Sequence, residues 1–180
     1  MRVARLLGVS LLVLAGLSGQ AFAIGLYVER LTDMNVNVCP VCHQVIVPGS
    51  IHEDAEDLIT TALGGALDEK GVGYTQELGV TPCLSVLIYR FQERRGGAFS
   101  VERPASVGFH VHLFDSSGLA KVFVFDETQR PLSENVFGFF TFLRRGARWI
   151  TAGELSREGV GKAVDFFADD LKAAASGGTP

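Results

Sequence analysis

The sequence predicts an α/β fold in which a small mixed sheet carries helices mainly on one face, as a sandwich. Three patterns lead to this prediction. Residues 106–113 alternate between apolar and polar side chains, and a turn at residues 115–118 leads into a returning strand at residues 119–125. Residues 51–67 repeat apolar side chains at helical spacing, and residues 84–91 form a strand that is apolar on both faces.

The amino-terminal residues 1–23 have the pattern of a secretory signal peptide. Arg2 and Arg5 give a basic start, residues 6–17 are apolar, and residues 21–23 form an A-x-A cleavage pattern. The apolar run is short for a membrane span. No cysteine follows it to accept a lipid, so we expect a periplasmic protein that is not a lipoprotein.

The remaining chain predicts a single domain at residues 24–172, followed by a flexible tail at residues 173–180. It contains no internal repeat or linker, and its length is enough for one hydrophobic core. The full chain of 180 residues has 16 basic and 20 acidic residues, a net charge of −4, and no basic stripe. This composition argues against nucleic acid as a partner.

The first half of the domain predicts a strand, a helix and a second strand. The first strand is expected at residues 44–48, with a weaker candidate at residues 25–28. Ser50 and Glu53 match a capping box that starts the long helix, and Gly71 ends it. One helix between two strands fits a right-handed parallel crossover.

The second hairpin strand and the segment that follows it are strongly apolar. Residues 119–125 have apolar side chains on both faces, which predicts a central strand. Ser133 is placed to cap a short helix at residues 134–144. Its residues 136–143 are rich in phenylalanine, so we expect this helix to be buried or to contact a partner or a membrane.

The last helix is predicted by a second capping box, formed by Thr151 and Glu154. An apolar face at helical spacing follows this box. Gly159 and Gly161 are expected to break the helix, because glycine is a poor helix former.

Several motifs resemble those of a family of exported deltaproteobacterial proteins, many of them lipoproteins and most of them uncharacterised. The motifs are VLIYRFQERR (86–95), RPASV (103–107), FDETQ (125–129), LSEN (132–135) and RWITA (148–152). The resemblance covers roughly residues 39–171. It implies a fold similar to the amino-terminal domain of TolB and to the envelope lipoproteins LpoB and CsgG. It also implies a non-enzymatic module that binds an envelope protein in cell-envelope assembly or maintenance.

The motif Cys39-Pro-Val-Cys42-His43 matches the C-x-x-C-H pattern by which c-type haem is attached. The two thiols would bond the haem vinyl groups, and the histidine would bind the iron axially. Candidates for the second axial ligand are His110, His112 and Met34. The alternative function is therefore a monohaem c-type cytochrome for periplasmic electron transfer.

The same motif fits two other chemistries, whereas a thioredoxin-like redox role is not expected, because no helix follows the C-x-x-C directly. A Cys₃His zinc site would use Cys39, Cys42, His43 and Cys83. His110 and His112 share one face of a predicted strand and are further possible zinc ligands. Without a cofactor, a Cys39–Cys42 or Cys42–Cys83 disulfide would hold the amino-terminal loop. We predict no cofactor, with haem c and zinc as the alternatives.

The polar segment at residues 125–135 is the remaining candidate for chemistry. Its carboxylates include Asp126 and Glu127, and paired carboxylates can exchange protons with a substrate. The sequence shows no nucleophile pattern beside them, no glycine-rich phosphate loop and no H-E-x-x-H. We therefore expect no enzyme. Asp126 and Gln129 are expected to bond backbone groups, and Arg90 to form a surface or turn ion pair.

Overall fold

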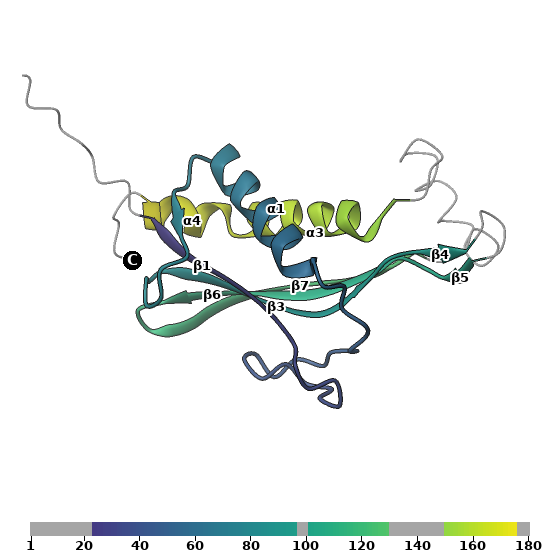
Figure 1. Ribbon diagram of the computed structural model, residues 1–180. Coiled ribbons are helices and arrows are strands. Elements are labelled where there is room, and N and C mark those ends of the chain that lie inside the picture. The colour runs from purple at the N-terminus through teal and green to yellow at the C-terminus, as the bar shows by residue number, and fades with distance from the viewer. Residues whose placement is uncertain (1–22, 97–100, 130–149, 176–180) are drawn as a thin grey trace, which may run out of the picture.

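The computed structural model describes residues 23–96, 101–129 and 150–175 (Figure 1). The predicted signal peptide, the phenylalanine-rich segment at residues 136–143 and most of the predicted tail lie outside these residues.

A five-stranded mixed sheet confirms the predicted fold class. Its strand order is β2-β1-β3-β6-β7. The strands are β1 (Ile24–Arg30), β2 (Tyr74–Thr75), β3 (Cys83–Gln92), β6 (Ser106–Asp115) and β7 (Gly118–Thr128). β1 runs parallel to β2 and β3, whereas β6 is antiparallel to both β3 and β7. Beside this sheet, β4 (Arg95–Gly96) pairs with β5 (Val101–Arg103).

The described helices cover one face of the sheet, as Figure 1 shows. They are α1 (Ala55–Glu69), α3 (Ala152–Phe166) and α4 (Ala168–Ala175). The main core lies between this helical layer and the sheet. On β6, Val107, Phe109 and Val111 point into it and are fully buried.

The opposite face of the sheet is covered by the loop at residues 31–54, which we call the cover loop (Figure 1). A second, smaller core forms beneath it. This core contains Leu31, Cys39, Ile46, Leu87 and Tyr89. Side chains alternate along a strand, so β6 points His110 and His112 to the face opposite its core valines.

The predicted first strand at residues 44–48 is wrong, and the weaker candidate near residue 25 marks the true first strand, β1. Val45 and Val47 are 78% and 61% exposed, and only Ile46 is turned inward. This segment lies over the sheet and does not join it. The crossover therefore runs from β1 through α1 to the parallel strand β3.

The predicted start of the long helix is also wrong. α1 begins at Ala55, and its N-cap Asp54 makes no side-chain capping bond. Backbone hydrogen bonds to β3 hold the preceding residues extended: Gly49 donates to Tyr89, and Phe91 donates to Ser50. The Ser50 carbonyl accepts a hydrogen bond from β3, so Ser50 lies beside this strand and does not cap the helix.

The prediction that residues 119–125 form a central strand is wrong as well. β7 is the last strand in the order and pairs with β6 on one side. Most of its side chains are exposed or half-buried. Its apolar residues on the outer face, among them Leu119 and Val124, remain about 40% exposed.

The capping box at the start of α3 is confirmed, but the predicted break is not. The backbone N–H of Glu154 donates to the Thr151 hydroxyl, and the Glu154 carboxylate accepts from the Thr151 N–H. α3 then continues through Gly159 and Gly161 to Phe166. The packing of α3 against β7 leaves no room for a side chain at Gly159, because a Cβ there would lie 2.6 Å from the Phe125 ring.

The same substitution is therefore expected to have opposite effects at Gly159 and at Gly161. Gly159→Ala forces the Phe125 ring aside and should destabilise the fold by about 1–3 kcal/mol. Gly161→Ala meets nothing within 4 Å and should stabilise the helix by up to about 1 kcal/mol. Urea unfolding of both variants measures the difference. Equal effects of the two substitutions would show that Gly159 is not packed against β7.

Candidate metal centre

Four potential metal ligands converge between the cover loop and the sheet. They are Cys39, Cys42, His110 and His112, whose ligand atoms all lie within 4.8 Å of one another. Cys39 and both histidines are fully buried, and Cys42 is partly exposed. Such a set of two soft thiol and two imidazole ligands is typical of zinc.

The cysteines are brought together by a tight turn in the cover loop. The His43 N–H donates to the Cys39 carbonyl at 3.0 Å, and the Cys39 N–H donates to the Gln44 carbonyl at 2.8 Å. His43 has φ of 59°, a left-handed conformation that closes the turn. The C-x-x-C spacing thus turns both thiols toward β6, and the His43 side chain points to solvent.

The histidines are positioned by the register of β6 against β3. His110 lies opposite Leu87, and His112 lies opposite Ser85. His112 Nδ1 is 3.2 Å from the Ser85 carbonyl, which can only accept, so Nδ1 carries the proton. The lone pair of His112 is therefore on Nε2, the atom that faces Cys39. A backbone acceptor that orients a ligating histidine in this way is common around metals.

The distances between paired ligands fit a tetrahedral ion. Cys39 Sγ lies 3.5 Å from His112 Nε2, and Cys42 Sγ lies 3.4 Å from His110 Nδ1. With Zn–S of about 2.3 Å and Zn–N of about 2.0 Å, tetrahedral sulfur and nitrogen ligands stand about 3.6 Å apart. All four ligand atoms lie within 4.8 Å of one another, so any pair would have to close by no more than about 1.5 Å on binding.

Burial keeps both histidines in the neutral form that binds metals. It lowers the pKa of His110 to about 4, with His112 as a second cause that lowers it and Asp126 as an opposing one. Burial also lowers the pKa of His112, against its hydrogen bond to Ser85. Burial raises the pKa of the Cys42 thiol. Without a metal the two histidines are thus neutral, and a bound cation would favour loss of the Cys42 proton to give a thiolate ligand.

His110 carries a polar atom that the fold leaves without a partner. Its Nε2 is buried and makes no hydrogen bond. The ring packs edge-on against Tyr89, with ring centroids 5.1 Å apart. A buried ring nitrogen without a partner is costly. A metal ion on Nδ1 would leave the proton of the neutral ring on this Nε2.

The structure places the predicted site residues in two groups. Cys39 and Cys42 lie in the cluster, together with His110 and His112, which the sequence offered as further ligands. His43 is exposed, and Cys83 lies at the start of β3, outside the four-residue group. The three cysteines are free, so neither predicted disulfide is formed.

An ion pair between the buried Arg90 and the more exposed Asp126 lies beside the cover loop, near the cluster. Arg90 donates to the Val47 carbonyl at 3.0 Å and forms a salt bridge with Asp126. Tyr89 Oη donates to the same carboxylate at 3.1 Å. Asp126 therefore bonds side chains, contrary to the prediction that it serves backbone groups, and the Arg90 side chain is only 11% exposed.

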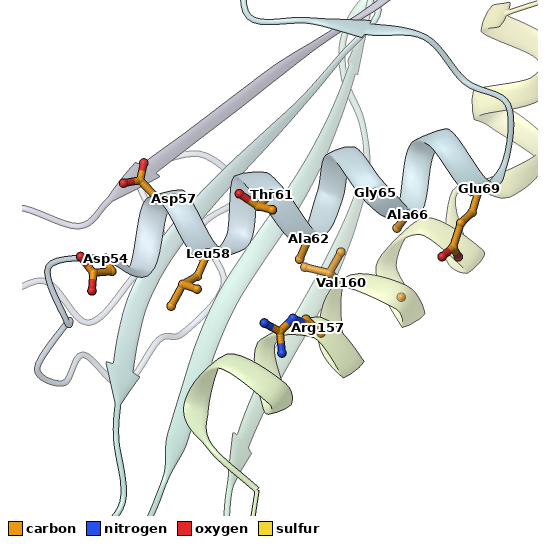
Figure 2. Close-up of a pocket in the computed structure, with 11 residues that line it drawn as sticks. Asp54, Asp57, Leu58, Thr61, Ala62, Gly65, Ala66, Glu69, Arg157 and Val160 are labelled. Atoms are coloured by element: carbon orange, nitrogen blue, oxygen red, sulfur yellow. The ribbon is translucent and has the colours of Figure 1, made fainter.

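The helical face carries a separate groove of about 600 Å³ between α1 and α3 (Figure 2). Asp54, Asp57, Glu69 and Arg157 line it around small apolar side chains such as Ala62. None of its described lining residues is a cysteine or histidine. Within the described ranges, the converging group of potential metal ligands lies on the opposite face of the sheet.

No family model and no curated protein matches the chain. The motif resemblance to the deltaproteobacterial family therefore stays a prediction. Among the residues that the structure describes, no helix is long and apolar enough to span a membrane.

Three solved structures are similar to the chain at low identity. A PelC dodecamer from Paraburkholderia phytofirmans is 11% identical over 80% of this chain and 88% of that one, with a TM-score of 0.47. A Xanthomonas campestris protein of family model DUF330 is 15% identical over 84% and 90%, with a TM-score of 0.42. A minor lipoprotein from Acinetobacter baumannii is 10% identical over 85% and 91%, with a TM-score of 0.32. Function has to be argued from the site itself.

Proposed function

We propose that this chain is a non-enzymatic interaction module of the cell envelope in which a zinc ion fastens the cover loop to the sheet. The observation that carries the proposal is the convergence of two cysteines from the loop with two histidines from β6. The envelope location rests on the signal-peptide pattern of residues 1–23.

The ligand set supports a structural role for the metal. Four protein ligands fill a tetrahedral ion and leave no position for water or substrate, as in structural zinc sites. Three of the four side chains are fully buried, so the site is approached from solvent only beside the partly exposed Cys42. A catalytic zinc would keep an open position, which these four ligands do not provide.

The metal would give the cover loop a defined outer surface. The middle of the loop, from Met34 to Ile46, has little to hold it besides its small core, because regular secondary structure is almost absent from residues 31–54. Its outer side carries the exposed apolar side chains Met34, Val45 and Val47. Exposed apolar groups on an ordered surface are typical of protein contacts. We assign the interaction role to this surface and to the edge strand β7.

Cobalt substitution tests the metal site directly. Co²⁺ added to the reduced, metal-free protein should bind at one ion per chain. Tetrahedral coordination with two thiolates should give intense visible bands and a sulfur-to-cobalt charge-transfer band in the near ultraviolet. Zinc should then displace the cobalt and bleach the spectrum. A pale, octahedral cobalt spectrum would contradict the proposal.

Covalent haem is the second candidate, favoured by the C-x-x-C-H motif itself. Its histidine, His43, is exposed, whereas the thiols face His110 and His112. The test is a visible spectrum of protein exported from a host with cytochrome c maturation machinery. We expect a colourless protein. A Soret band that survives acid–acetone extraction would establish haem and overturn the zinc proposal.

A further inference from the structure

The four ligands are divided evenly between two parts of the chain. Cys39 and Cys42 belong to the cover loop, and His110 and His112 belong to β6. A metal bound by all four is therefore a cross-link between the loop and the sheet. A Cys39–Cys42 disulfide would be a different cross-link, because it would join the turn only to itself.

We propose that the site is a redox-sensitive clamp, in which oxidation of Cys39 and Cys42 to a disulfide expels the metal and frees the cover loop from β6. This inference rests on the proposed metal site and names its regulation. The oxidant is a small-molecule or protein disulfide.

The geometry favours formation of this disulfide over others. The two sulfur atoms lie within 4.8 Å of each other, and a disulfide brings them to about 2.05 Å. Both cysteines lie on one turn, so the required movement is a side-chain and turn adjustment. Cys83 lies outside the cluster, at the start of β3.

The order of the thiol–disulfide exchange steps follows from the unequal burial of the two cysteines. Cys42 is partly exposed and Cys39 is fully buried. Cys42 Sγ therefore attacks the oxidant first, breaks its S–S bond and releases one thiolate. Cys39 Sγ then attacks Cys42 Sγ in the mixed disulfide and releases the second thiolate. Two electrons pass from the cysteine thiolates to the oxidant disulfide, and the metal leaves as a divalent cation.

The contacts of the cover loop define what its release would change. Backbone hydrogen bonds hold its two ends: Leu31 donates to the Ile88 carbonyl at 2.7 Å, and Gly49 donates to the Tyr89 carbonyl at 2.9 Å. Between these ends, the ligand cluster, the buried side chain of Ile46 and the Arg90 hydrogen bond to the Val47 carbonyl hold the loop against the sheet. Loss of the metal should loosen this middle part and uncover the Leu87 side chain beneath it.

Oxidation of the zinc-loaded full chain tests the clamp. Oxidised glutathione is the oxidant, a chromogenic zinc indicator measures released metal, and peptide mass spectrometry locates the disulfide. We expect release of one zinc per chain together with a Cys39–Cys42 disulfide. The Ile46 amide, which donates to the Asn37 carbonyl, should exchange hydrogen at least tenfold faster. A dithiol with added zinc should reverse all three changes.

Two variants serve as controls. Cys83→Ser should respond as the parent protein does, because Cys83 is not a ligand. His112→Ala removes one of the two sheet-side ligands and weakens zinc binding, so its Ile46 amide should already exchange faster, and oxidation should accelerate it less than in the parent protein.

The outcomes separate this inference from the metal site on which it rests. If the reduced protein binds no zinc, the proposed function fails and the clamp fails with it. If zinc binds but stays bound after oxidation, or if the disulfide involves Cys83, the metal site stands and the clamp is wrong. Release of zinc without faster exchange at Ile46 would also overturn it.

Discussion

Replacing Cys39 by serine should weaken zinc binding by at least about a hundredfold. Structural zinc sites bind with about 10–16 kcal/mol in total, so one of four ligands accounts for roughly 3 kcal/mol, which is about two orders of magnitude in affinity. Cys39 is fully buried in the cluster, and serine keeps its size but offers no thiolate. Competition with a chromogenic chelator measures the affinity.

The chain offers a matched control for each kind of ligand. Cys83→Ser makes the same chemical change outside the cluster and should leave the zinc affinity unchanged. His112→Ala should weaken binding as Cys39→Ser does, whereas His43→Ala should not, because His43 is exposed. Equal losses in Cys39→Ser and Cys83→Ser would instead support the Cys₃His set predicted from the sequence.

Removal of zinc by a chelator should lower the melting temperature by about 10 °C. A ligand at 1,000 times its dissociation constant stabilises the folded state by about 4 kcal/mol. For a chain of this length, each kcal/mol shifts the melting temperature by about 2–4 °C. Thermal unfolding followed by circular dichroism, with and without chelator under reducing conditions, gives the shift.

The loss of stability should be concentrated in the cover loop. The main core lies on the other face of the sheet and does not contain the ligands. Hydrogen exchange should therefore rise at Ile46 and remain slow in the centres of β3 and β6. Cys39→Ser protein, which binds zinc more weakly, should show a smaller response to chelator than the parent protein. The same melting temperature with and without chelator in the parent protein would contradict a structural metal.

Local patterns were sufficient to predict most of the elements. Period-two alternation located the hairpin that became β6 and β7, and helical periodicity located α1. The side chains of Thr151 and Glu154 marked the start of α3, because a capping box depends only on residues close in sequence.

The errors concern residues whose structure depends on distant contacts. Residues 44–48 are as apolar as a buried strand, yet Val45 and Val47 are exposed because the segment crosses over the sheet. Ser50 has the sequence of a helix cap, but its carbonyl accepts a hydrogen bond from Phe91. In both cases contacts with the distant strand β3 place the segment. A local sequence pattern does not contain this information.

The candidate site was half predictable for the same reason. The C-x-x-C spacing identified Cys39 and Cys42, and alternation placed His110 and His112 on one face of a strand. His43 was favoured as a ligand because it adjoins Cys42, but its left-handed backbone turns its side chain outward. Only the position of the cover loop over β6 selects the two distant histidines.

Zinc K-edge X-ray absorption of the zinc-loaded full chain tests the central claim most directly. The proposed site predicts one zinc per chain, with two sulfur ligands at about 2.3 Å and two nitrogen ligands at about 2.0 Å. Imidazole scattering should require both histidines and should weaken in His112→Ala. Three sulfur ligands would contradict the Cys39, Cys42, His110 and His112 set, and so would a zinc bound only by oxygen and nitrogen.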